Sequence, residues 1–166
     1  GYVTNVLFLA DRKALVRQAK AAFMEYLGST NYTYCNLVEN KDDKNARMVF
    51  STYPTMLNAI NEEKKKDGKK LFSEAHFDLV IIDEAHRSIY NKYAALFEYF
   101  DAYIVGLTAT PKNMDAASTY SFFKCPPKLP TYAYEYETAR DVDHYLVPYY
   151  NIEVSTQIMQ EGVHYD

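Results

Sequence analysis

Apolar residues along this chain gather in short runs that alternate with stretches of helical spacing. Four continuous apolar runs predict buried strands at 5–10, 48–52, 78–83 and 102–111. Apolar residues three or four positions apart predict helices at 11–28, 54–63, 88–100 and, more briefly, 114–121. Strands that are apolar throughout are typical of a parallel sheet covered on both faces. The pattern therefore predicts an α/β fold with helices on both faces of a parallel sheet.

Residues at the predicted helix ends fit this interpretation. Asp11 stands where an N-cap is expected, Gly28 is a C-terminal stop, and Pro54 ends a strand and opens a helix. The apolar positions predicted for the first helix are Leu15, Ala19, Ala22, Phe23, Tyr26 and Leu27.

The pattern changes near residue 125. The stretch CPPKLP breaks the alternation, 131–138 alternates like an exposed strand, and 141–156 holds a last apolar run. We therefore predict a main domain at 1–125 and a turn-rich segment with strands at 126–166.

Polar side chains follow three of the predicted strands. In open parallel sheets, ligands bind at the carboxyl ends of the strands. An aspartate at such an end can hold Mg²⁺ through water, and a second acid can deprotonate an attacking water. Taken alone, an apolar run that ends in an acid is more often an ordinary solvated strand end. The residues at these ends are Ser51, Thr52, Asp83, Glu84, His86, Thr108 and Thr110.

Two short motifs favour the chemical interpretation. The strand at 78–83 leads into Asp-Glu-Ala-His, and GLTATP follows on the next strand. Together they resemble motifs II and III of superfamily 2 helicases and translocases. LFLADRKALVRQA resembles motif Ia, and VFSTYPTM resembles motif Ib. The longer string from Phe77 to Pro111 is most similar to the motor (R) subunit of type I restriction enzymes.

The resemblance implies a RecA-like first motor lobe that uses ATP and Mg²⁺, with 126–166 leading toward a second lobe. It implies that Asp83 positions Mg²⁺ through water and that Glu84 is the catalytic base. Asp83 and Glu84 together would bind the nucleotide. His86 would link the nucleotide site to the second lobe.

The same resemblance implies the contacts with nucleic acid. Thr108 and Thr110 would couple hydrolysis to the grip on DNA. Arg12, Ser51 and Thr52 would touch the DNA backbone, as a sequence-independent translocase requires. The implied partners are duplex DNA, the second motor lobe, and the methylase and specificity subunits of a restriction complex in the cytoplasm.

One part of the family pattern is missing from the sequence. No G-x-x-x-x-G-K-[ST] phosphate loop is present, and DGKKL at 67–71 lacks both the first glycine and the final hydroxyl residue. We interpret the chain as a fragment of a longer motor, and a degenerate lobe is the alternative. In either case we expect the isolated chain to hydrolyse ATP poorly or not at all.

Three functions stay open at this point. The first is a DNA translocase lobe of a type I restriction R subunit, whose parent is also a candidate endodeoxyribonuclease. The second is a DEAD/DEAH-box helicase of another group that acts on RNA or in DNA repair. The third is a non-catalytic module derived from a motor lobe, against which the intact Asp83-Glu84 pair argues.

Charge and composition add limited detail. Net charge is −4, but residues 1–70 carry 12 Lys/Arg against 8 Asp/Glu, whereas the remainder carries 6 against 14. A basic face is therefore expected in the first part, and the stretch 62–70 is predicted as a solvated segment or, alternatively, a polyanion contact. Cys35 and Cys125 are predicted as thiols, the 141–144 cluster is not favoured as a metal site, and no membrane span is expected.

Overall fold

The computed structural model describes residues 3–40, 45–61, 70–85, 93–110, 113–114 and 117–150, with the side chains of 113–118 left aside. The chain divides into two compact units, Gly1–Pro130 and Thr131–Asp166.

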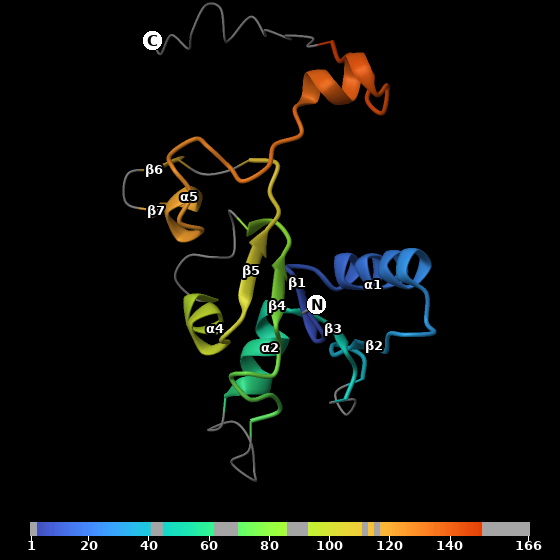
Figure 1. Cartoon of the computed structure of the whole chain (residues 1–166), viewed down its shortest axis with the longest axis vertical. Coiled ribbons are helices and arrows are strands. Elements are labelled where there is room, and N and C mark those ends of the chain that lie inside the picture. The colour runs from blue at the N-terminus through green and yellow to red at the C-terminus, as the bar shows by residue number, and fades with distance from the viewer. Residues whose placement is uncertain are drawn as a thin grey trace, which may run out of the picture. The chain divides into compact units, whose positions relative to one another are not determined.

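The first unit is built on a five-stranded sheet in the order β2-β3-β1-β4-β5, and every pairing in this sheet is parallel (Figure 1). This confirms the predicted α/β fold with a parallel sheet. The central strand β1 pairs with β3 on one side and β4 on the other. The strands are β1 Val6–Ala10, β2 Tyr34–Asn36, β3 Met48–Thr52, β4 Leu79–Ile82 and β5 Tyr103–Gly106.

Helices lie on both faces of this sheet (Figure 1). Helix α1 covers one face, where Val16 packs with Phe8 and Phe50. Helices α2 and α4 cover the other face, where Met56 and Leu96 join the larger apolar core. Alternate residues of β1 and β3 point into the two cores, which explains why these strands are apolar throughout. The helices are α1 Lys13–Leu27, α2 Tyr53–Ile60, α4 Ala94–Tyr99 and the short α5 Thr119–Phe122.

The ends of α1 confirm one prediction and correct another. Gly28 ends the helix in a left-handed conformation, with φ of 70°, and its N–H bonds to the Met24 carbonyl. The N-cap is Arg12 rather than Asp11, and no side chain caps the helix. Tyr26 is 82% exposed and Leu27 46% exposed, so the predicted apolar face ends a turn early.

Two further segments differ from the sequence prediction. Strand β2 was not predicted, because three residues are too few to give a period. The predicted helix at 114–121 is wrong at 114, 117 and 118 and agrees with the structure at 119–121, while 115–116 lie outside the described residues. The chain there forms the antiparallel pair β6 Asn113–Met114 and β7 Ala117–Ser118 before α5 begins. The third predicted helix, at 88–100, agrees over 94–99, and its residues before 93 lie outside the described part.

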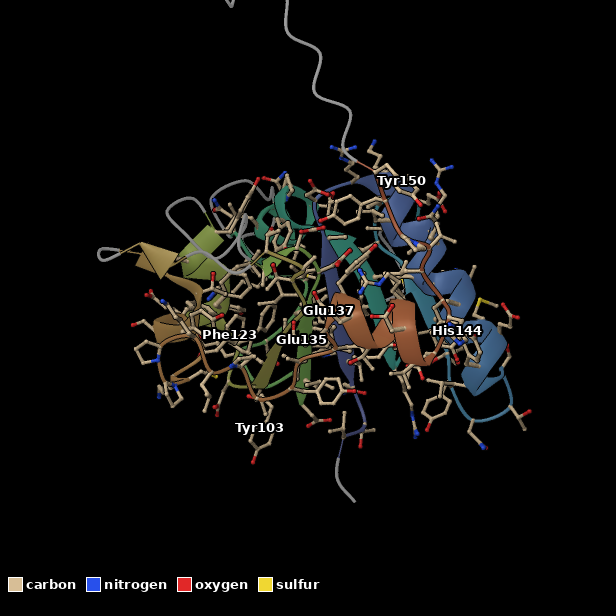
Figure 2. The ribbon with its side chains drawn as sticks, turned by 90° about the horizontal axis from the view of Figure 1, so that it is seen from above. Tyr103, Phe123, Glu135, Glu137, His144 and Tyr150 are labelled. Carbon is tan, nitrogen blue, oxygen red and sulfur yellow. The ribbon has the colours of Figure 1, made fainter. Side chains whose placement is uncertain are left out.

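Strand β5 is one of the two edge strands of the sheet and is much more exposed than the other strands. Tyr103 is 80% exposed, and its ring points away from the ribbon in Figure 2. Val105 and Leu107 on the same side of the strand are 45% and 49% exposed. The apolar run that predicted this strand therefore reflects its place in the sheet, but it does not mean burial on both faces.

The second unit contains no strand among its described residues, so the strand predicted at 131–138 is wrong. A π-helix, η3 Thr138–Val142, begins at the last residue of that range. Local bonds hold it: the Tyr136 hydroxyl donates to the Val147 carbonyl at 3.0 Å, and the Tyr134 hydroxyl donates to Asp143. The bond to the Asp143 carboxylate raises the pKa of Tyr134 to about 12.

Two smaller expectations concern membrane-spanning helices and the two cysteines. Within the part of the chain that the structure describes, no helix combines the length and apolar character needed to cross a membrane. Cys35 and Cys125 form no disulfide.

Candidate nucleotide and nucleic-acid site

The carboxyl ends of four neighbouring strands meet at one edge of the sheet. The register pairs Ala10 of β1 with Thr52 of β3, and Ile82 of β4 with Gly106 of β5. One line of residues therefore runs along this edge. It contains the end of β3 and the residues that follow β1, β4 and β5. This edge is called the carboxyl edge below, and it gathers the strand-end residues predicted from the sequence.

Asp83 and Glu84 follow β4, the strand next to the centre. The Asp83 N–H donates to the Leu9 carbonyl of β1 at 2.9 Å, so the first acid continues the sheet ladder. Its Oδ1 accepts the Glu84 N–H at 3.0 Å. Glu84 has a φ of 51°, a left-handed conformation that costs a residue other than glycine about 1–2 kcal/mol. Both side chains are half-buried, which suits groups that must meet a ligand.

The turn after β5 is tied directly to this acidic turn. The Leu107 N–H donates to the Ile82 carbonyl at 2.8 Å, and the Ala85 N–H donates back to the Leu107 carbonyl at 2.9 Å. One residue further on, the Thr108 hydroxyl accepts the Thr110 N–H at 3.1 Å. The two predicted motifs are thus joined through backbone hydrogen bonds.

Ser51 and Thr52 end β3 and are both buried, at 0% and 6% exposure. The Ser51 hydroxyl donates to the Thr52 carbonyl at 3.1 Å, and the Thr52 hydroxyl lies 2.9 Å from the Thr55 hydroxyl. The hydroxyl groups of this strand end therefore already have partners inside the protein. The nearby exposed position is Pro54, in the first turn of α2.

Arg12 lies beyond the end of the central strand and is exposed. Its Nε is 3.8 Å from Asp11 Oδ2, and 71% of its side chain is exposed. An exposed pair of this kind contributes little to stability. The guanidinium can therefore exchange this neighbour for an anion at small cost.

His86 lies outside the described residues, as do Arg87 and Ser88 and most of the lysine-rich stretch. The structure brings together the other predicted site residues at the carboxyl edge, namely Arg12, Ser51, Thr52, Asp83, Glu84, Thr108 and Thr110.

The acid pair fits a hydrated Mg²⁺ better than a fully protein-bound metal. Within the described ranges, no group of three or more His, Cys, Asp or Glu side chains could hold a metal ion. Mg²⁺ commonly keeps several waters and takes one or two carboxylates beside the phosphates of its nucleotide. Asp83 can supply one such carboxylate.

Two residues of this site were missed in the sequence. Tyr53 is 1% exposed, and its hydroxyl donates to the Asp83 carbonyl at 2.9 Å. Phe123 packs so closely on Gly106 that a Cβ there would lie 2.1 Å from its ring. Both contacts join residues far apart in the sequence, so no local pattern could have revealed them.

The fold and this edge define a RecA-like lobe of a superfamily 2 helicase. The chain belongs to the family described as "Type III restriction enzyme, res subunit", whose model matches residues 1–113. A solved structure, the Hef helicase domain of Pyrococcus furiosus, shares the fold, with a TM-score of 0.58 and 21% identity over 75% of this chain and 28% of that one.

Two curated relatives come from Escherichia coli. The type I restriction enzyme EcoAI endonuclease subunit is 29% identical over 95% of this chain and 19% of its own length. The EcoKI endonuclease subunit of strain K12 is 26% identical over 96% of this chain and 15% of its own length. These matches confirm the predicted likeness to type I motor subunits. The chain spans about a fifth or less of each relative.

Proposed function

We propose that this chain is part of the first motor lobe of an ATP-dependent DNA translocase of the type I restriction kind. The observation that carries the proposal is the Asp83-Glu84 turn, held at the carboxyl edge and bonded to the turn before Thr108. The names of the two relatives support a restriction complex as the setting. Such a complex would supply duplex DNA, methylase and specificity subunits, and a second motor lobe as partners, in the cytoplasm.

In the proposed reaction Asp83 would hold a hydrated Mg²⁺, and the ion would supply positive charge against the nucleotide phosphates. Glu84 accepts a proton from the attacking water. Thr108 and Thr110 report the state of the nucleotide to the DNA-binding surface through the bonded turns. His86 contacts the second lobe. DNA cleavage is proposed for a separate part of the longer protein.

Arg12 is the proposed direct contact with a DNA phosphate, because it is exposed next to the acid pair's edge of the sheet. Ser51 and Thr52 are buried, so we propose that they hold the first turn of α2 against the DNA backbone. Replacing Arg12 by Ala should reduce the slope of log affinity against log salt by about 1. Arg17→Ala is the matched control, since Arg17 is 65% exposed and pairs with Glu39 instead.

The decisive experiment measures ATP hydrolysis by a protein that includes both motor lobes, with linear duplex DNA of increasing length. Hydrolysis that grows with DNA length and vanishes in Glu84→Gln supports the duplex translocase. Stimulation by single-stranded RNA would favour a helicase of another group instead. If no ATP turnover depends on Glu84, a non-catalytic binding module is the function that remains.

The 166-residue chain by itself provides a second test. Its sequence contains no G-x-x-x-x-G-K-[ST] loop, which supplies the backbone N–H groups that bind ATP phosphates. We expect the isolated chain to hydrolyse ATP poorly or not at all, and robust Glu84-dependent turnover would contradict this.

A further inference from the structure

Tyr53 lies at the junction between two parts of the carboxyl edge. It is the first residue of α2 and follows Thr52 directly in the chain. Its ring is buried, stacking on Tyr93 with centroids 5.0 Å apart and meeting Phe97 edge-on at 6.4 Å. From this packed position its hydroxyl donates to the Asp83 carbonyl at 2.9 Å. One side chain thus connects the end of β3 with the acidic turn after β4.

Three bonds from three elements hold the peptide groups around Glu84. The Asp83 N–H bonds to β1 through Leu9, and the Ala85 N–H bonds to the Leu107 carbonyl after β5. The third is the Tyr53 bond to the Asp83 carbonyl, and of these three it is the one made by a side chain. Between these anchors Glu84 keeps a left-handed φ of 51°, a conformation that persists where its surroundings fix it.

We propose that Tyr53 is a positioning residue that couples nucleic-acid binding at the β3 end to the orientation of Asp83 and Glu84. The inference rests on the proposed function. A displacement of Thr52 moves the adjoining Tyr53, and the rigid ring, held between Tyr93 and Phe97, carries that movement to the Asp83 carbonyl. The orientation of Asp83 and Glu84 then depends on whether nucleic acid is bound at the end of β3.

Tyr53→Phe tests this proposal because it removes the hydroxyl and keeps the buried ring. Tyr99→Phe is the matched control: the Tyr99 hydroxyl also donates to a backbone carbonyl, that of Phe72, at 2.8 Å. That bond lies away from the acidic turn, between α4 and the segment before β4. Both variants therefore lose one hydroxyl-to-carbonyl bond, and only one of them alters the coupling.

The readout is ATP hydrolysis by the protein with both lobes, measured over a range of ATP and duplex DNA concentrations. We expect Tyr53→Phe to lower the DNA-stimulated kcat by about two- to ten-fold, the range that one hydrogen bond covers. The ratio of stimulated to unstimulated hydrolysis should fall with it. Tyr99→Phe should keep the wild-type ratio, although its melting temperature falls.

A second measurement is hydrogen exchange in the wild-type protein and in Tyr53→Phe. Hydrogen exchange at the Ala85 amide, which bonds to the Leu107 carbonyl, should change when duplex DNA is added, and in Tyr53→Phe this response should be smaller.

Equal stimulation ratios in the two variants, with the same DNA response at Ala85, would show that the Tyr53 hydroxyl serves stability alone and would overturn the inference. If the wild-type protein shows no Glu84-dependent, DNA-stimulated hydrolysis, the proposed function fails, and the coupling role falls with it. The Glu84→Gln control separates these two failures.

Discussion

Strand β4 has an aspartate near each end, and the two serve different purposes. At its amino end, Asp78 Oδ2 accepts the N–H groups of Thr4 and Asn5 at 2.7 and 2.9 Å. The Asn5 side chain in turn donates to the His76 carbonyl at 2.9 Å. The carboxylate of Asp78 therefore fastens the chain that enters β1 to the start of β4.

At the carboxyl end, Asp83 Oδ1 accepts the N–H of its own neighbour, Glu84, a local contact that fastens no second strand. Backbone bonds and the Tyr53 hydroxyl hold this turn instead. An acid at a strand end is structural when its carboxylate holds another segment, as Asp78 does. It is suited to chemistry when other groups hold the turn, as they do around Asp83.

The sharpest test of this comparison is Glu84→Gln. The change keeps the shape of the side chain and removes its basicity, so we expect kcat for ATP hydrolysis to fall about 10²–10⁴-fold in a protein with both lobes. The unfolding curve should hardly move. A large loss of stability with modest loss of rate would place Glu84 on the structural side of the comparison.

Gly106→Ala should destabilise the carboxyl edge through packing. The added Cβ would lie 2.1 Å from Phe123 Cζ, so the ring or the strand must shift. We expect the free energy of unfolding to fall by about 1–3 kcal/mol, measured by urea denaturation. In a Phe123→Ala background the same change should cost less. An equal loss of unfolding free energy in both backgrounds would mean that the contact with Phe123 is not what excludes a Cβ at position 106.

Asp78→Asn should lower the melting temperature, because the amide is a weaker acceptor for two N–H groups than the carboxylate. Those backbone bonds hold the pKa of Asp78 below its usual 3.8. The carboxylate therefore stabilises the fold above pH 3.8, and this contribution is lost as pH falls through the lowered folded-state pKa. The gap between wild type and variant should close in acid. Asp101→Asn, an exposed acid before β5, is the control.

The smallest expected effect concerns His76, whose ring lies beside Phe72 and Phe77 with centroids 4.8 and 4.7 Å away. Burial lowers its pKa from 6.5, although Asp78 acts in the opposite direction. The unfolded chain therefore gains a proton first as pH falls below 6.5, and stability declines until the folded-state pKa is reached. Denaturant unfolding at pH 7.5 and 5.5 should show a smaller decline in His76→Phe. If the decline in stability is the same in His76→Phe as in the wild type, other titratable groups cause the pH dependence.

Much of the fold could be predicted because its signals are local. Strand β3 agrees with its predicted bounds, β1 differs by one residue at one end, and β4 differs by one residue at each end. The weak points were short or exposed segments. The alternation at 131–138 predicted a strand, yet the described part of the second unit contains no strand, and Thr138 begins the π-helix η3.

The residues of the candidate site could also be predicted where the signal was local, and not where it depended on tertiary packing. Sequence order and motif identity pointed to Asp83, Glu84, Thr108 and Thr110, and parallel topology brings their strand ends together. Burial could not be foreseen in the same way. Ser51 and Thr52 look like accessible hydroxyl residues in the sequence, but they end a strand with partners on both sides.

The sequence by itself determined the alternating strands and helices, the placement of the acid pair after a buried strand, and the family. These properties depend on the spacing of apolar residues and on short motifs, which neighbouring positions specify. Only the tertiary structure decided that Tyr53 bonds to Asp83, that Phe123 covers Gly106, and that Asp78 fastens β1. Those contacts join residues distant along the chain, and they exist because packing the sheet and its helices brings the side chains together.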